Sequence, residues 1–163
     1  MHRITSMAAA LVAVGFLALP SVSFGQATVE RFSDPPTSVG PDLVDDTCAG
    51  LGVVGVLTGT ETFAGQWVNT ATGEHFVGSD TLVYRVDFAD GSYLLASQRE
   101  PLTFSSNPLN GQQQFGGTLL EKGTLYDAAG NVIGHEMFHA RFRTNIVDGA
   151  VVVEFDEGFL TCR

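Results

Sequence analysis

Apolar and polar side chains alternate one by one between residues 138 and 146, and this period constrains the fold more than any other feature of the chain. The apolar or small positions are Phe138, Ala140, Phe142, Thr144 and Ile146, and the positions between them are His139, Arg141, Arg143 and Asn145. A period of two residues is typical of a half-buried β-strand. Asp148-Gly149 follows, a strong signal for a tight hairpin turn, and then the β-branched run 151–153. The pattern predicts a closing β-hairpin.

A two-residue loop at 148–149 fixes which residues of this hairpin would face each other. The predicted pairs are Arg143 with Glu154, Arg141 with Asp156, Phe142 with Phe155, and Ile146 with Val151. The first two pairs join opposite charges on one face, and the other two join apolar side chains on the other face. Directly opposed pairs of these kinds contribute roughly 0.2–1 kcal/mol each, so the register supports the strand prediction.

Residues 135–139 also spell H-E-x-x-H, the zinc motif of a class of metalloproteases. In that motif a helix brings the two histidines onto one face, and the glutamate activates a zinc-bound water. In a strand the two histidines lie about 13 Å apart, and Glu136 points to the opposite face. The longer form of the motif fails as well, because Phe142 and Asn145 stand where a glycine and a third histidine are needed. We therefore expect two strand histidines and no metal site, rather than a zinc protease.

Residues 1–27 have the parts of an export signal. His2 and Arg3 form a short basic start, an apolar run covers Met7–Leu19, and Pro20 and small residues complete the segment. The apolar run is too short to span a membrane, and no later run reaches about 18 apolar residues. We expect a secreted protein, extracellular or periplasmic, that has no membrane association after the signal is cleaved.

Cleavage would leave a strongly acidic chain. Of the eight Lys and Arg residues only Arg3 lies in the signal, whereas all 18 Asp and Glu residues follow it, so the formal net charge changes from −10 to −11. This charge argues against binding to nucleic acid or to an anionic membrane surface. The acids are scattered or paired without a long acidic run, and we interpret them as a solvated surface.

Both cysteines, Cys48 and Cys162, lie after the signal. In an exported protein an even pair of cysteines predicts a disulfide. It would close a loop of about 115 residues, for which the chain-entropy model gives an upper figure of nearly 5 kcal/mol. It would also tie the first strand of the domain to the last, which suits a sheet that closes on itself.

The chain after the signal divides into an arm and one domain. Residues 28–47 contain Pro35, Pro36 and Pro41, and we expect an extended N-terminal arm with no regular element. From Cys48 onward strand-like runs alternate with turn signals, and no convincing helix occurs. The expected strands include 51–58, 60–69, 74–78, 82–88 and 115–126, and Ser105–Gln114 is the longest expected loop. Asp90-Gly91 predicts another tight turn, with Phe88 opposite Tyr93 and Val86 opposite Leu95.

These elements predict an all-β fold, an antiparallel seven- or eight-stranded up-and-down barrel over residues 48–163 that is closed by one disulfide. Side chains that point into such a barrel either fill it or leave room for one apolar ligand. A filled interior is the simpler interpretation, because aromatic residues at strand spacing are more often core than pocket. The candidates for lining a ligand are Tyr84, Val86, Phe88, Phe138, Phe142 and Phe155, and Val153 belongs to the same expected inward set.

The order of features along the chain resembles small secreted bacterial barrel proteins of unassigned function. These features are the signal, an early Cys, a strand-rich middle, G-x-L-Y-D-x-x-G-N-V at 123–132, H-x-R-F-R-T-N at 139–145, a D-G turn and a late Cys. The architecture of those proteins is similar to calycin, allene oxide cyclase and dirigent-type barrels. The resemblance implies a barrel and transfers no catalytic residue, because no cyclase motif occurs in the chain.

Three functions from different classes fit such a barrel. The one we favour is a secreted binding module for a small apolar ligand. The second is a cyclase-like or isomerase-like enzyme acting on a small hydrophobic substrate, which needs polar residues such as Tyr84, Glu136, His139 or Arg141 to face inward. The third is a structural or interaction protein that meets a partner through the arm or an exposed face. The sequence contains no phosphate loop, dinucleotide fingerprint, EF-hand or G-x-S-x-G motif, so we expect no cofactor, and it leaves the oligomeric state open.

Overall fold

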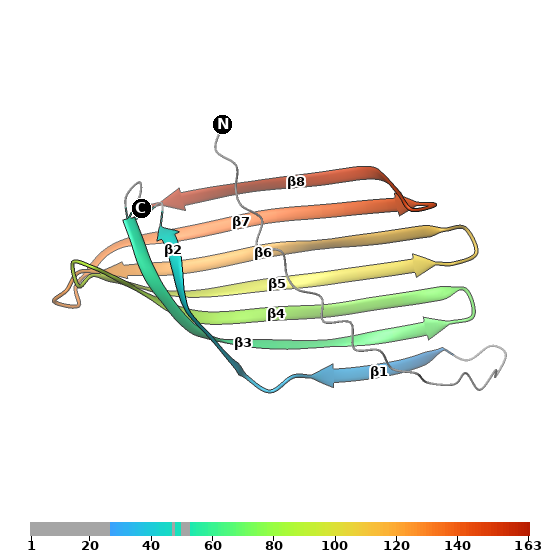
Figure 1. Cartoon of the computed structure of the whole chain (residues 1–163), viewed down its shortest axis with the longest axis horizontal. Helices are drawn as coiled ribbons and strands as arrows, with labels where there is room; N and C mark the ends of the chain where they lie inside the picture. The colour runs from blue at the N-terminus through green and yellow to red at the C-terminus, as the bar shows by residue number, and fades with distance from the viewer. Residues whose placement is uncertain (1–26, 47, 50–52) are drawn as a thin grey trace.

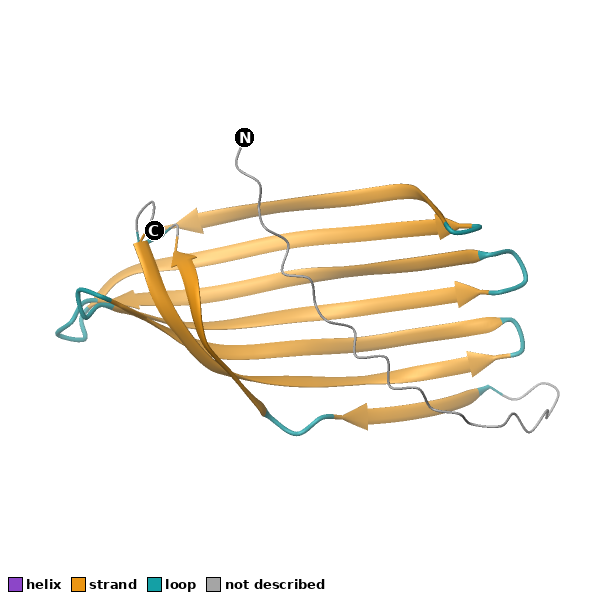
Figure 2. Ribbon diagram, in the orientation of Figure 1, coloured by secondary structure: helices purple, strands orange, loops and turns teal. Residues whose placement is uncertain are grey.

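A computed structural model describes residues 27–46, 48–49 and 53–163 (Figure 1). The expected export signal, residues 1–27, lies outside these residues except for Ala27. Every regular element in the described part of the chain is a β-strand, which confirms the all-β prediction (Figure 2). The strands are β1 (Thr28–Ser33), β2 (Thr37–Asp46), β3 (Val53–Thr70), β4 (Gly73–Phe88), β5 (Tyr93–Asn107), β6 (Gln112–Tyr126), β7 (Val132–Val147) and β8 (Ala150–Cys162).

All eight strands belong to one antiparallel sheet. Strands β3 to β8 follow one another in chain order, as an up-and-down topology requires. Strand β3 carries both N-terminal strands on its other side, because β1 pairs with its second half and β2 with its first half. Among the described residues no pairing joins β8 to β1 or β2, so the sheet is open along one side.

The prediction of an N-terminal arm without regular structure is wrong. Strands β1 and β2 occupy most of that segment and pair with β3. The prolines stand where a strand tolerates them: Pro35 and Pro36 lie between β1 and β2, and Pro41 lies at the irregularity in β2 between Val39 and Asp42. Proline lacks a backbone N–H, and a bulge or a link between strands does not need one.

Two pairs of expected short strands are in fact single long strands. The described part of the expected strand 51–58, residues 53–58, and the expected strand 60–69 both fall within β3, and 74–78 and 82–88 fall within β4; residues 51 and 52 lie outside the described residues. The expected loop Ser105–Gln114 is shorter, because β5 continues to Asn107 and β6 begins at Gln112. Glycines inside these strands make room for large neighbours: a Cβ on Gly65 would lie 2.7 Å from Cε2 of Phe76.

The closing hairpin turns where the sequence predicts, but its register is shifted by a bulge. Asp148 and Gly149 have φ angles of 51° and 79°, as a type I′ turn requires, and Ile146 faces Val151 as expected. The register then slips by one residue at Val152. The other three predicted pairs are therefore wrong, since Arg143 faces Phe155, Phe142 faces Asp156, and Arg141 faces Glu157. A slip of one residue moves every later side chain to the other face of the sheet.

The turn after β4 is also longer than predicted. The N–H of Phe88 donates to the carbonyl of Ser92 at 3.0 Å, and Gly91 has a φ angle of 85°. As a result Tyr93 faces Asp87 and Leu94 faces Val86. The predicted pairing of Phe88 with Tyr93 and of Val86 with Leu95 is therefore wrong by one position.

The buried apolar residues lie on one face of the sheet, and we call it the inner face. The strand register places on it the odd-numbered residues of β3 and β6 and the even-numbered residues of β4, β5 and β7. The buried core on this face consists of Leu57, Tyr84, Val86, Phe88, Leu94 and Ala96. Val39 and Val44 of β2 pack against this core, so β2 helps to cover one end of the inner face.

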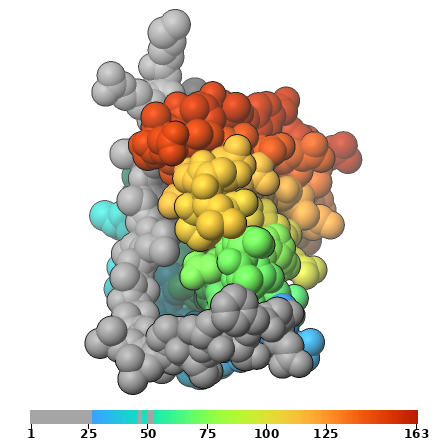
Figure 3. Space-filling view, turned by 90° about the vertical axis from the view of Figure 1, so that its right-hand side faces the viewer, coloured from blue at the N-terminus to red at the C-terminus, as the bar shows by residue number. Residues whose placement is uncertain are grey.

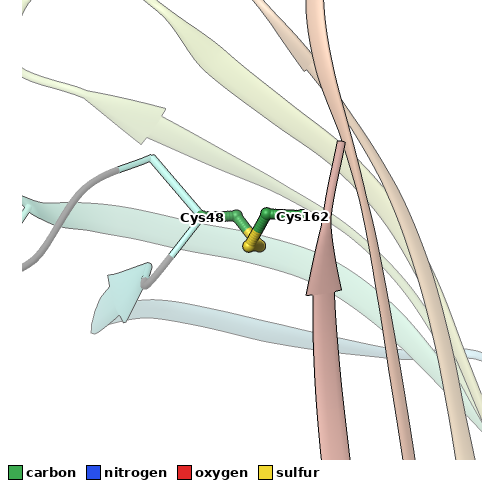
Figure 4. Close-up of a disulfide and its surroundings, with 2 residues drawn as sticks. All are labelled: Cys48 and Cys162. Carbon is green, nitrogen blue, oxygen red and sulfur yellow. A yellow bond between two sulfur atoms is a disulfide. The ribbon is translucent and has the colours of Figure 1, made fainter.

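A disulfide fixes the same end of the sheet. Cys48, between β2 and β3, is bonded to Cys162 at the end of β8, with a Cα–Cα distance of 5.5 Å (Figure 4). The two residues are 114 positions apart in the sequence, so the bond confirms the predicted link between early and late strands. At the opposite end of the sheet the β3–β4, β5–β6 and β7–β8 loops stack in chain order (Figure 3).

Candidate functional site

The inner face has three zones that follow one another along the strands. The first is the buried core beside the disulfide. The second is a carboxyl belt across the middle of the sheet, formed by Glu61 of β3, Asp80 of β4 and Glu100 of β5. The third is an aromatic zone toward the far end, formed by Phe32, Phe63, Trp67, Phe76 and Phe104. The second and third zones are the candidate site.

The aromatic zone is a set of rings in mutual contact. The rings of Trp67 and Phe76 have centroids 4.9 Å apart, and those of Trp67 and Phe104 are 5.9 Å apart. Phe32 of β1 joins the zone through Phe63, at 5.5 Å. Phe76 is buried, whereas the other four rings are only partly buried. Aromatic surface thus remains accessible on a face that is otherwise the inside of the sheet.

The carboxyl belt places like charges next to each other. Asp80 faces Glu100 directly across β4 and β5, and Glu61 lies one diagonal step from Asp80 on β3. Asp80 also faces Phe63, so the belt adjoins the aromatic zone without a gap. All three acidic residues are partly buried. Like charges at directly opposed positions destabilise a sheet, so this arrangement has an energetic cost.

Two belt carboxyls, Glu61 and Glu100, have a pKa above that of an ordinary glutamate. For Glu61 the largest cause of the raised pKa is a hydrogen bond with Asp80, followed by burial and then by the negative charges of Asp80 and Glu100. For Glu100 the larger cause of the raised pKa is burial, followed by the charge of Asp80. Both groups therefore hold a proton to a higher pH than an ordinary glutamate does.

Asp80 Oδ1 is fully buried and, among the described residues, accepts no hydrogen bond. Glu61 can donate a hydrogen bond to Asp80 only while it is protonated, because an ionised carboxylate carries no donor. A buried acceptor without a donor costs about 1–3 kcal/mol. When the three carboxyls of the belt are ionised, none of them can donate a hydrogen bond to the others.

The basic residues on the described strands all occupy outer-face positions. They are Arg31, His75, Arg85, Arg99, Lys122, His135, His139, Arg141 and Arg143. Inner-face positions instead hold acidic residues on several strands. In addition to the three belt residues, these include Glu121 of β6 and Asp156 of β8. A face lined with charge of one sign concentrates the electrostatic potential along it. Here the potential is negative.

The H-E-x-x-H segment lies in strand β7, which supports the rejection of the zinc-protease interpretation. His135 and His139 point outward, where His135 Nδ1 lies 3.2 Å from Thr124 Oγ1 and the His139 ring packs 5.1 Å from Phe159. Glu136 points inward and is buried. In the described part of the chain no three His, Cys, Asp or Glu side chains are grouped to hold a metal ion.

The six predicted ligand-lining residues fall into three groups. Tyr84, Val86 and Phe88 belong to the buried core, so they support the inner face rather than its accessible part. Phe138 and Phe142 lie partly buried on the inner face. Phe155, with Val153, lies on the outer face and is 46% exposed, because the bulge at Val152 reverses this part of β8. A lining role for any of them stays a prediction.

The carboxyl belt was missed because the acids look scattered in the sequence. Their interpretation as a solvated surface is wrong for Glu61, Asp80 and Glu100, which lie partly buried on the inner face. A signal did exist, because Asp80 has the parity of Tyr84 and Phe88 in one strand, and that parity predicts a shared face. Seeing the belt also requires the register between strands, which short sequence patterns do not supply.

No protein-family model, no curated protein and no solved structure matches this chain. Within the described residues there is no helix of sufficient length and apolar character to cross a membrane.

Proposed function

We propose that this protein is an exported binding module that holds a small apolar ligand against the inner face of its sheet. The observation that carries the proposal is the aromatic zone, where the rings of Phe63, Trp67 and Phe104 remain partly exposed. At the disulfide end the same face is filled by its own side chains. A concave, mostly apolar surface with a few polar groups is the usual form of a small-molecule site.

The proposal includes a lumen around the ligand. The eight strands would then be the wall of an up-and-down barrel, of the calycin, allene oxide cyclase or dirigent type. The chain-order topology of β3–β8 and the Cys48–Cys162 bond support closure, because they bring the two sides of the sheet together at one end. A stable disulfide is also typical of extracellular and periplasmic proteins, which supports export.

The proposal is tested with the neutral fluorescent probe N-phenyl-1-naphthylamine, whose emission rises in an apolar site. The chain offers a pair of variants, since Phe104 belongs to the aromatic zone of the inner face and Phe155 lies on the outer face. We expect Phe104→Ser to weaken probe binding about tenfold, the equivalent of roughly 1.4 kcal/mol, and Phe155→Ser to leave it unchanged. No saturable probe binding to the wild-type protein, or equal losses in both variants, would overturn the proposal.

A second candidate function, an interaction protein, is favoured by strand β8. This strand is the edge of the sheet, and all its residues from Ala150 to Leu160 are exposed. An exposed edge strand is a template on which another chain can add a strand. Light scattering after size-exclusion chromatography separates the candidates, because a ligand-binding monomer keeps its mass over a concentration series and a self-pairing edge does not.

The enzyme alternative has less support. It requires polar residues on the inner face, and of the four that it names only Tyr84 and Glu136 lie there. His139 and Arg141 occupy outer-face positions. Tyr84 in addition belongs to the buried core, away from the accessible aromatic zone.

A further inference from the structure

The accessible part of the inner face joins two kinds of surface that seldom suit the same neutral ligand. Aromatic rings offer contact to an apolar body, whereas the carboxyl belt beside them offers negative charge. The two are contiguous, because Phe63 of the aromatic zone faces Asp80 of the belt across β3 and β4. A ligand that packs against the aromatic rings therefore has one end next to the carboxyl groups of the belt.

The belt is built in a way that leaves it incomplete without a cation. Asp80 Oδ1 is fully buried without a donor, and Asp80 directly faces a second acid, Glu100. The basic side chains of the described strands all occupy the opposite face of the sheet. A positive group with N–H donors placed at the belt would donate to its accessible carboxylate oxygens, offset the charge on the buried oxygen and reduce the repulsion between the acids.

The aromatic zone also favours a ligand with a positive charge. The face of an aromatic ring carries negative potential, so it attracts ammonium groups, and Trp is the strongest of these rings. Trp67 contacts both Phe76 and Phe104 within the zone. A bare metal ion gains little from such rings, whereas an organic cation gains both the charge contact and the burial of its apolar part.

We infer that the ligand class of this site is an amphiphilic amine, a protonated primary or secondary ammonium group that carries an apolar chain or ring. The ammonium group lies at Glu61, Asp80 and Glu100, donates hydrogen bonds to their carboxylates, and leaves the apolar body against the aromatic zone. This inference rests on the proposed function and narrows it, because it adds the charge of the ligand to its apolar character.

The test compares three ligands that share a ten-carbon chain and differ in charge. Decylamine is cationic, 1-decanol is neutral and decanoate is anionic at pH 7.5, and each is used below its micellar concentration or, for 1-decanol, below its solubility limit. Binding is followed by calorimetry and by the emission of Trp67, the only tryptophan in the chain. We expect decylamine to bind at least about tenfold more tightly than 1-decanol, and decanoate to bind most weakly. Added salt should reduce the advantage of decylamine and leave 1-decanol binding unchanged.

Variants of the protein then test whether the belt carboxylates cause the preference for the amine. The triple variant Glu61→Gln, Asp80→Asn, Glu100→Gln keeps the shape of the belt and should bind decylamine and 1-decanol with equal affinity. The control Asp45→Asn, Glu157→Gln removes two acids at outer-face positions and should keep the preference for the amine. Thermal unfolding of each variant checks its fold, and the salt series on the wild-type protein gives a test that needs no variant.

The outcomes separate this inference from the proposed function. If 1-decanol and decylamine bind equally to the wild-type protein, the apolar site stands and the amine inference fails. The inference also fails if the triple variant keeps the preference, or if the outer-face control loses it. If none of the three ligands binds, both the proposed function and the inference fail.

Discussion

Asp80 and Glu100 face each other directly on adjacent strands, and both side chains are partly withdrawn from solvent. A pair of acids at such a position is unfavourable for the sheet and would be simple to replace with neutral residues of similar shape. The cost it imposes on the folded state should appear as a dependence of stability on pH.

The raised pKa values of Glu61 and Glu100 predict that the belt becomes less favourable as the pH rises. The folded chain holds these two protons more tightly than the unfolded chain, whose ordinary glutamate pKa is 4.5. The contribution of these two protons to the free energy of unfolding is fully present when the pH is below the pKa of the unfolded chain. It is lost as the pH rises through the raised pKa values of the folded chain. The variant Glu61→Gln, Glu100→Gln should therefore match the wild-type protein near pH 4 and exceed its free energy of unfolding at pH 7.5 by about 1 kcal/mol.

Urea unfolding at a series of pH values measures this difference. All other carboxyls on the inner face, including Asp80 of β4 and Glu121 of β6, stay unchanged in both proteins. Asp90 and Asp127 have lowered pKa values because of hydrogen bonds within their turns, and their opposite effect on stability cancels in the comparison. A stability difference that stays constant from pH 4 to pH 7.5 would contradict the prediction.

Removal of the disulfide should destabilise the protein strongly. The bond closes a loop in which the two cysteines are 114 positions apart, and the unfolded chain gains most freedom when a long loop is released. The variant Cys48→Ser, Cys162→Ser should lose about 2–5 kcal/mol of its free energy of unfolding in guanidinium titrations. Dithiothreitol should lower the stability of the wild-type protein by a similar amount and have no effect on the variant, which is the internal control.

Glycine on the inner face should resist substitution where a ring lies over it. A Cβ at Gly65 would lie 2.7 Å from Cε2 of Phe76, so Gly65→Ala should cost about 1–3 kcal/mol as Phe76 is displaced. The matched control is Gly158→Ala in β8, where the nearest atoms to the new Cβ are 3.4 Å away. That change should be neutral or slightly stabilising, because glycine weakens a strand. Equal melting temperatures for the two variants would contradict the prediction, because they would mean that the Phe76 ring tolerates a Cβ at position 65 without loss of stability.

The fold class could be predicted from the sequence because its signals are local. Alternation from Phe138 to Ile146 requires only neighbouring residues, and the Asp148-Gly149 turn is formed by residues that accept positive φ angles. The pairing of Cys48 with Cys162 followed from there being only two cysteines. These three predictions are confirmed by strand β7, by the turn and by the disulfide.

The register of the strands could not be predicted, and the candidate site depends on it. A single extra residue, Val152, moved Phe155 from the expected inner face to the outer face. One further residue in the turn at 89–92 shifted the pairing of β4 with β5. The carboxyl belt arises only when β3, β4 and β5 align Glu61, Asp80 and Glu100, and that alignment is a property of the whole sheet.

The free edge of β8 provides a test of how this strand is bonded. His135 and Arg163 exchange both backbone hydrogen bonds, at 2.8 Å each, and hydrogen-bonded pairs alternate with non-bonded pairs along an antiparallel ladder. The register is unbroken from Glu136 to Asn145, so odd-numbered residues of β8 donate to β7, and even-numbered residues point their N–H groups to the open edge. Asp156→Pro should therefore keep the ladder, whereas Glu157→Pro should remove one of its bonds.

We expect Glu157→Pro to be less stable than Asp156→Pro by about 1–3 kcal/mol in urea unfolding, because only the first variant leaves an acceptor of β7 without its donor. The same two proteins also test self-association through β8. If the edge pairs with a second copy, Asp156→Pro removes an outward donor and shifts the mass measured by light scattering toward the monomer. Equal destabilisation by the two prolines would contradict the assigned bonding of β8, because the two N–H groups point in opposite directions only if the alternation holds.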